Sequence, residues 1–388
     1  MFSLFRSFLA PLLSLALMMV ASGFFNTFVS IRLEIEGYSP ELIGIVTSFL
    51  YLGILLGSLK IDYWILKTGH IRSFILFSGI LAVLALFQAF WINPWYWCAL
   101  RLFGGVCIAG IFIVIESWML IQSPPEKRGI VLSLYLAIFY AALSGGQFLI
   151  NLSDPTGIFP FCIAAALMVL SILPFSIRPI PSPTKVKEPP RLTILQLFRI
   201  SPLGFAGGVV SGMLLAAVYG LVPIYAKEVG MSLSQISLFM AVIIFGGFIF
   251  QWPFGLWADK TNRRLVLNIA SFLAACAAVA MGWIGPDPFF LLLLLGWLFG
   301  GFSFALYPLS MAYSCENVRQ DHIVAVTGGF VMSYGLGAIS GPILAPMSMG
   351  FFGIAGLFYF LAAVTFILAL LGLKRPAPIK SWDKIQDK

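Results

Sequence analysis

Long apolar stretches alternate with short polar connections along the whole chain. The apolar stretches lie at 8–32, 41–59, 73–92, 96–120, 130–151, 157–177, 202–226, 235–257, 265–284, 289–313, 324–348 and 351–373. Each is close to the roughly 20 residues that a helix needs to cross the hydrocarbon core of a bilayer. The pattern therefore predicts an all-α polytopic membrane protein with twelve transmembrane helices in two groups of six.

One connection is longer than the others and different in composition. Residues 178–200 are rich in proline and basic side chains and are too polar to cross a bilayer, which is typical of a linker between domains. We therefore predict an N-terminal six-helix bundle at 1–177, a cytoplasmic linker at 178–200, a C-terminal six-helix bundle at 201–373 and a cytoplasmic tail at 374–388. The first apolar stretch lacks a small-residue cleavage site, so we interpret it as a retained helix rather than a signal peptide.

The composition excludes a soluble globular protein. Of the 388 residues, 60% are hydrophobic and 10% are charged, whereas soluble proteins carry about 25% charged residues. The net charge is +8, and membrane topology explains where the basic residues lie. If both termini are cytoplasmic, twenty of the 23 lysines and arginines fall on the cytoplasmic side. We therefore expect a multi-pass protein of the bacterial inner membrane, with lipid around it and no nucleic-acid partner. The five cysteines have no metal-binding or redox spacing, so no metal is predicted.

The two groups of six helices repeat a sequence pattern. A shift of 193 residues lays Gly37–Gly53 over Gly230–Gly246, and glycines, a serine and an isoleucine coincide. A shift of 196 residues aligns later glycines: Gly104, Gly105 and Gly145 fall on Gly300, Gly301 and Gly341. The halves are typical of a parallel duplication, which in transporters places the substrate site between the halves near the middle of the membrane.

A charged motif follows the eighth apolar stretch. It reads GLWADKTNRR and offers a glycine that allows helices to approach, an aspartate that can pair with a basic residue, and two arginines that can bridge to the other half. The first half has a degenerate version at the same place, GSLKIDYWILKTGHIR. From these segments and from an acidic residue near the inner end of the fourth helix we predict a cytoplasmic gate: Asp62, Arg72, Glu116, Gly255, Asp259, Arg263 and Arg264.

These features resemble those of a known transporter family. The spacing G-x-x-x-D-x-x-x-R-R, carried here by Gly255–Arg264, is similar to the cytoplasmic signature of the major facilitator superfamily. Three further segments, Arg101–Leu120, Tyr225–Gly255 and Tyr307–Pro342, resemble the YcaD-like bacterial permeases of that superfamily, a group related to drug-efflux transporters. The resemblance covers nearly the whole chain and implies two pseudo-symmetric six-helix bundles that alternate access to a central site.

Two charged residues in the fourth apolar stretch are candidates for proton coupling. A charge inside a bilayer is costly unless it is paired or hydrated. Arg101 heads a pattern that resembles the R-x-x-x-G signature of proton-coupled members. It is a candidate to attract an anionic substrate group or to depress the pKa of a nearby carboxyl, and snorkelling to the headgroups is the alternative. Glu116 lies about 22 Å farther along the same helix face, too far to touch Arg101. It is either the carboxyl that carries the proton or a partner of a basic gate residue.

Polar residues in other helices are candidates for the substrate cavity. A shift of 193 places Asn26 on Tyr219, so both halves offer a hydrogen-bonding group at matching depth. For any one candidate, a hydrogen bond between helices is an equally good explanation. The cavity candidates are Asn26, Arg101, Gln147, Tyr219, Gln251, Tyr307 and Tyr334. Close packing or bending is predicted at Gly145, Gly146, Gly337, Gly341 and Pro342.

The sequence favours a secondary transporter over an enzyme, a channel or a receptor. It has no phosphate-binding glycine loop and no nucleophile beside a base. We expect proton-coupled efflux of a small organic solute by a monomer, driven by the proton gradient without a bound cofactor. Proton-coupled import of a polar or anionic metabolite, such as a carboxylate siderophore, is the alternative, because the fifth helix has Gly146 where the antiporter signature of drug exporters has proline.

Overall fold

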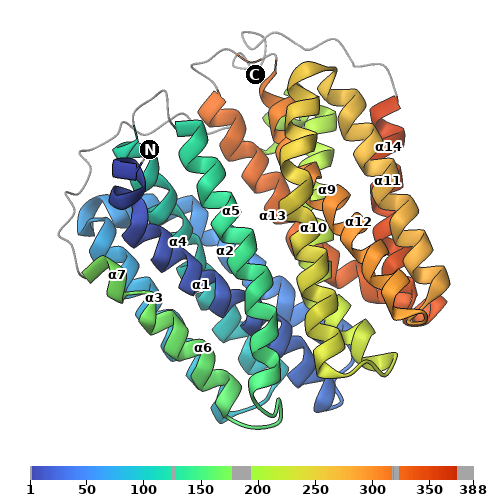
Figure 1. Cartoon of the computed structure of the whole chain (residues 1–388), viewed down its shortest axis with the longest axis horizontal. Helices are drawn as coiled ribbons and strands as arrows, with labels where there is room; N and C mark the ends of the chain where they lie inside the picture. The colour runs from blue at the N-terminus through green and yellow to red at the C-terminus, as the bar shows by residue number, and fades with distance from the viewer. Residues whose placement is uncertain (1, 124–127, 177–193, 317, 319–322, 374–388) are drawn as a thin grey trace. The chain divides into compact units, whose positions relative to one another are not determined.

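The chain folds almost entirely into α-helices (Figure 1). The computed structural model describes residues 2–123, 128–176, 194–316, 318 and 323–373. In chain order the helices are α1 (Phe2–Ile35), α2 (Pro40–Thr68), α3 (His70–Phe90), α4 (Pro94–Gln122), α5 (Arg128–Gly146), the 3₁₀ helix η2 (Gln147–Leu152), α6 (Phe159–Leu170), α7 (Leu173–Ser176), α8 (Ile194–Ile200), α9 (Pro202–Glu228), α10 (Leu233–Lys260), α11 (Arg263–Ile284), α12 (Phe289–Cys315), α13 (Ile323–Phe352) and α14 (Gly356–Leu373). The predicted all-α membrane fold is confirmed.

Eleven of the described helices are long and apolar enough to cross a membrane. The remaining predicted span, 157–177, contains a shorter apolar stretch, Phe159–Phe175, that is divided into α6 and α7. The division falls at Ser171, whose hydroxyl donates to the carbonyl oxygen of Met168 at 2.6 Å. A serine bonded to a carbonyl of the preceding turn competes with the helical hydrogen bonds, which favours a break here. Together these helices make two sets of six.

Contacts divide the chain into two compact units. One contains Met1–Val186 and Gly230–Ala241, and the other contains Lys187–Val229 and Val242–Lys388. The first unit therefore takes in the beginning of α10 besides the first six membrane helices.

Asn151 of η2 binds that first part of α10. Its Nδ2 donates to Ser237 Oγ at 2.9 Å, and its Oδ1 accepts from Ser234 Oγ at 3.2 Å. The hydroxyl of Ser144 in α5 donates to the carbonyl oxygen of Ala241 at 2.9 Å. These three hydrogen bonds explain why the start of α10 belongs to the first unit.

The helices of each unit pack in the same pairs. In the first unit α1 packs against α5 and α6, α4 packs against α2 and α3, and α3 packs against α6. In the second unit α9 packs against α13 and α14, and α11 packs against α12 and α14. The pair α10 and α12 meets at Gly246 and Gly300. Since α1 to α6 correspond in order to α9 to α14, the repeat in the sequence is also a repeat of structure.

Glycines let helix backbones touch at matching places in both units. A Cβ on Gly105 of α4 would collide with the carbonyl oxygen of Leu50 in α2, and a Cβ on Gly300 of α12 would collide with that of Ile243 in α10. Leu50 and Ile243 are related by the shift of 193 found in the sequence, but the two glycines are related by 195. The predicted shift of 196 for the later helices is therefore one residue too long.

The fifth helix of each unit packs against the first helix of that unit at equivalent positions. Gly146 of α5 lies against the backbone of Val20, and Gly341 of α13 lies against the backbone of Met213. Val20 and Met213 are again 193 residues apart, and the two glycines are 195 apart. Among the described residues, nothing lies within 4 Å of a Cβ built on Gly145. Of the two positions predicted to pack closely in this helix, Gly146 does so and Gly145 does not.

Two further positions expected to pack or bend lie in α13. A Cβ on Gly337 would collide with the carbonyl oxygen of Val209 in α9, so this glycine is a point of close approach. Pro342 lies inside α13, where it removes one backbone donor from the helix.

The end of the predicted linker is helical. Ile194–Ile200 form α8, and its Leu197 and Ile200 are buried against Val326 and Phe330 of α13. The interpretation of 178–200 as linker is thus corrected for its last seven residues, because their apolar side chains anchor them to the second unit. Residues 178–193 of the linker and the predicted tail, 374–388, lie outside the described residues.

Gly146→Ala and Gly145→Ala form a matched pair, since each adds one methyl group at neighbouring positions of α5. We expect Gly146→Ala to lower the thermal unfolding midpoint, because the new Cβ would collide with the Val20 backbone and force α1 away from α5. Gly145→Ala should leave the midpoint unchanged or raise it, because alanine is favoured over glycine in a helix by about 0.5–1 kcal/mol. Thermal unfolding of both variants in detergent measures the difference, and equal midpoints would contradict the register given above.

Candidate functional site

Arg101 is a cation in the interior of the first unit. It lies seven residues into the span Pro94–Met119, and 5% of its surface is exposed. It is the only charged residue that lies more than four residues from both ends of any of the eleven described spans. A cation at such a position is costly in a bilayer, so its surroundings must compensate the charge.

Neighbours from α1 and α2 surround the guanidinium. Its Nη1 donates to Oδ1 of Asn26 at 2.7 Å, and its Cζ lies 5.3 Å from the ring centre of Phe25. Tyr51 of α2 is close enough to interact with it electrostatically. Among the described side chains, no carboxylate forms an ion pair with Arg101. A charge-assisted hydrogen bond and an aromatic face therefore stabilise the cation inside the unit.

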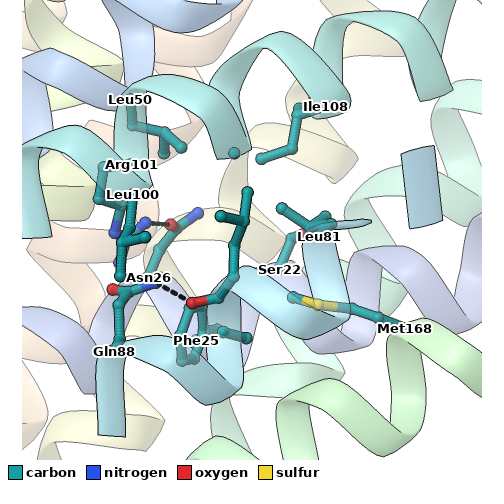
Figure 2. A pocket seen from close by; sticks show the side chains of 13 residues that line it. Ser22, Phe25, Asn26, Leu50, Leu81, Gln88, Leu100, Arg101, Ile108 and Met168 are labelled. Carbon is teal, nitrogen blue, oxygen red and sulfur yellow. Dashed lines mark hydrogen bonds between the residues drawn. The ribbon is translucent and has the colours of Figure 1, made fainter. Parts of the chain in front are cut away.

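A small cavity lies beside Arg101 (Figure 2). Its volume is about 20 Å³, and its lining comes from α1, α2, α3, α4 and α6 of the first unit. Most of the lining is apolar, and its polar members are Ser22, Asn26, Gln88 and Arg101. The structure thus brings together Asn26 and Arg101, two of the predicted cavity residues.

Gln147 has a different role from the one expected. It is fully buried, its Oε1 accepts a hydrogen bond from Thr27 Oγ1 at 2.7 Å, and its Nε2 donates to the carbonyl oxygen of Gly23 at 2.9 Å. Both partners belong to α1, so Gln147 joins η2 to α1. The amide therefore serves a contact between helices, the alternative that the sequence leaves open for each cavity candidate.

The predicted cavity residues of the second unit are mainly aromatic. The rings of Tyr307 in α12 and Tyr334 in α13 are 5.2 Å apart and nearly perpendicular, and Tyr307 also lies 5.1 Å from the ring of Phe330. Tyr219 of α9 makes an edge-to-face contact of 6.2 Å with Phe304. Gln251 of α10 is half-buried. None of these residues lies in the same unit as Arg101.

Two predicted gate residues of the first half, Glu116 and Arg72, form no ion pair with each other in the described part of the chain. Glu116 is exposed on α4, Arg72 is exposed on α3, and the side chain of Asp62 lies outside the described residues. Among the side chains that the structure describes, Glu116 forms no ion pair. Neither Glu116 nor Arg72 borders the cavity beside Arg101.

The charged motif at the end of α10 makes contacts within the second unit. Asp259 at the end of α10 pairs with Arg263 at the start of α11, with Oδ1 and Nη2 3.3 Å apart. Arg264 Nε donates to the carbonyl oxygen of Gly372 at 2.7 Å and so caps the last turn of α14. A Cβ on Gly255 would have no described atom within 4 Å, so the helix approach expected there is not observed within the unit.

The sequence matches the family model of the Major Facilitator Superfamily over residues 11–287 and 204–388. It is 33% identical over 375 residues to an uncharacterized MFS-type transporter YcaD of Escherichia fergusonii, with 95% of this chain and 96% of that protein covered. It is 31% identical over 383 residues to the protein of the same name from an Escherichia coli strain, with 96% and 98% covered. This chain belongs to the major facilitator superfamily.

Solved structures of transporters share the superfamily fold with this chain. The nucleoside transporter NupG superposes with a TM-score of 0.77 at 15% identity, covering 94% of this chain and 98% of that one. A D-xylose-proton symporter superposes with a TM-score of 0.75 at 14% identity, covering 97% and 98%. At these identities the likeness to the solved structures shows the fold alone. Membership of the major facilitator superfamily, shown by the family model and the relatives above, makes the chain a multi-pass secondary transporter.

Sequence reasoning overlooked two polar residues at the buried arginine of this superfamily member. Gln88 is an amide within the third apolar stretch, and its position there could have marked it as a candidate. Ser22 gives no such signal, because buried serines are common in these helices and most of them bond to their own backbone. Only the fold shows that both residues border the cavity beside Arg101.

Arg264→Gln tests whether Arg264 caps the last turn of α14. Arg263→Gln is the matched control, because it removes the same charge from the neighbouring residue. We expect Arg264→Gln to lower the free energy of unfolding by about 1 kcal/mol, because it takes a charged donor from a helix-terminal carbonyl. Arg263→Gln should have little effect, because its pair with Asp259 is largely exposed. Denaturant titration in detergent compares the two, and a larger loss with Arg263→Gln would refute the capping role.

Proposed function

We propose that this transporter exports small organic solutes in exchange for protons across the inner membrane of a bacterial cell. The proton gradient supplies the energy, so the cycle needs no bound cofactor, and one chain in a lipid bilayer is sufficient. The concentration of lysine and arginine on the side of the termini supports a cytoplasmic position for both ends. The relatives named above are bacterial, which supports the inner membrane.

The repeated architecture supports a cycle of alternating access. Each unit has the same helix pairs and the same glycine contacts, so each is a compact body that can move as a whole. Transporters built from parallel repeats bind substrate between the repeats near the middle of the membrane and expose that site to each side in turn.

One observation carries the export proposal. Several polar candidates for the cavity already form hydrogen bonds or ring contacts with residues of their own unit. Asn26 bonds to Arg101 and Gln147 bonds to α1, while Tyr307 and Tyr334 pack their rings together. Groups that are already hydrogen-bonded offer little to a strongly polar solute, whereas aromatic faces suit an amphipathic organic compound. These features favour an organic solute with substantial apolar surface.

Arg101 favours the second candidate function, import of a polar or anionic metabolite. Its charge has no carboxylate partner among the described side chains. A carboxylate group of a substrate would complete a bidentate pair with a guanidinium. In that case transport would be symport, with protons entering together with the anion.

Proton movement in proteoliposomes that contain a pH-sensitive dye separates the two functions. A pH gradient is imposed in either direction across the liposome membrane. We expect that drugs or other amphipathic compounds move in one direction and protons move in the opposite direction. Proton flux in the same direction as an added organic acid would establish the import function instead. Liposomes that carry Arg101→Gln provide a second comparison. If the variant loses the proton flux driven by organic acids but keeps the flux driven by amphipathic compounds, Arg101 is the anion-binding group.

Glu116→Gln tests how protons are coupled to transport. Glu116 is exposed on α4 and has no ion pair among the described side chains, which suits a carboxyl that gains and releases a proton. We expect the variant to lose proton-driven accumulation of a labelled substrate and to retain exchange of labelled for unlabelled substrate. Loss of both activities at normal protein level would identify Glu116 as a gate residue, and full activity in both assays would remove it from the mechanism.

A further inference from the structure

Three buried polar atoms of the residues around the cavity have no hydrogen-bond partner among the described residues. They are Nε of Arg101, Oε1 of Gln88 and Oγ of Ser22. The exposed fractions of these residues are 5%, 2% and 9%, respectively. They come from three helices, α4, α3 and α1, whose residues line one cavity. In Figure 2 the side chains of Arg101 and Gln88 lie on one side of the view and Ser22 on the other. Since buried polar groups are nearly always satisfied, three around one small space indicate a shared partner.

The chemistry of the three atoms defines that partner. Arg101 Nε can only donate a hydrogen bond, Gln88 Oε1 can only accept one, and the Ser22 hydroxyl can do either. The orientation of the Gln88 amide is set by its Nε2, which donates to the carbonyl oxygen of Leu84 at 3.4 Å. An anion would satisfy Arg101 but would be repelled by the Gln88 oxygen, and a cation would be repelled by Arg101. The partner must therefore be neutral and able both to accept and to donate.

The size of the cavity limits the partner further. The volume is about 20 Å³, and a water molecule needs roughly 10–15 Å³ of such space together with two to four polar neighbours. A metabolite is far too large. The site has the volume and the polar neighbours that suit a single water molecule.

We propose that the cavity binds one structural water molecule, which accepts a hydrogen bond from Arg101 Nε and donates one to Gln88 Oε1, with Ser22 as its third partner. The water completes the hydrogen bonding of the guanidinium, whose Nη1 is already used by Asn26. Gln88 and Ser22 are then positioning residues, because they act on Arg101 through the water. The proposal does not depend on the direction of transport, but binding of a substrate carboxylate at Arg101, as in the import function, would require the water to leave.

X-ray radiolytic footprinting of the full-length protein in detergent tests the site. Radicals formed from bound water label the side chains next to it, even when those side chains are buried. Met168 lines the cavity and is 2% exposed, whereas Met240 and Met281 are equally buried and do not line it. We expect Met168 to be oxidised several times faster than Met240 and Met281. Equal rates at the three methionines would overturn the proposal.

Gly104→Ala displaces the water without disturbing the helices. Gly104 lines the cavity, and a Cβ built on it would meet only Leu81 Cδ1, at 3.4 Å, so one methyl group enters the space that the water would occupy. Gly79→Ala is the matched control, because a Cβ there has no described atom within 4 Å and the residue does not line the cavity. We expect Met168 oxidation to fall to the rate of Met281 in Gly104→Ala and to remain high in Gly79→Ala. A rate that stays high in Gly104→Ala would show that another source of radicals labels Met168.

Replacing chloride by gluconate distinguishes water from a small anion. If water occupies the site, the oxidation of Met168 is the same in both salts. If chloride occupies it, removal of chloride lets water enter and the oxidation rate rises. That rise would refute the proposal and assign an anion site to Arg101.

Discussion

Direct contact between helix backbones is the constraint on which this fold depends. In a bilayer the hydrophobic effect does not drive helices together, because lipid tails are as apolar as the side chains, so association relies on close packing and polar contacts. Gly105 and Gly146 in the first unit, and Gly300 and Gly341 in the second, each lie against a backbone of a neighbouring helix. A larger side chain at any of these positions would separate the pair. The glycines therefore fix both the distance between helices and their register along the helix axis.

Much of this architecture could be predicted from the sequence, because lipid imposes a simple rule on helix length and polarity. The ends of the eleven described membrane spans agree with the apolar stretches to within five residues, and the sixth stretch is divided at Ser171. For the repeat, the shift of 193 agrees with the helix contacts, and the shift of 196 for the later helices is one residue too long. In the sequence, Gly104 and Gly105 are equivalent partners for Gly300, and only the contact with Leu50 identifies Gly105 as the true counterpart.

The candidate site was less predictable for a related reason. Composition and spacing show that a polar residue lies in a membrane helix, but the side of the helix that it faces depends on the packing of the whole unit. Gln147 and Asn26 are both amides within apolar stretches, yet one joins η2 to α1 and the other binds a buried cation. Arg101 stands out in the sequence because a charge is rare in a span. Gln88 and Ser22 acquire meaning only from their position beside it.

The difference in register between the halves also records how they diverged. The counterparts α3 and α11 begin 193 residues apart, at His70 and Arg263, but α4 and α12 begin 195 apart, at Pro94 and Phe289. α11 has 22 residues against 21 in α3, and the connection after it has four residues, 285–288, against three, 91–93. The two additional residues therefore lie at a helix end and in a connection, where a change of length is tolerated. The halves therefore differ in length only at the surface of this segment, while the buried helix contacts of both halves keep the same spacing.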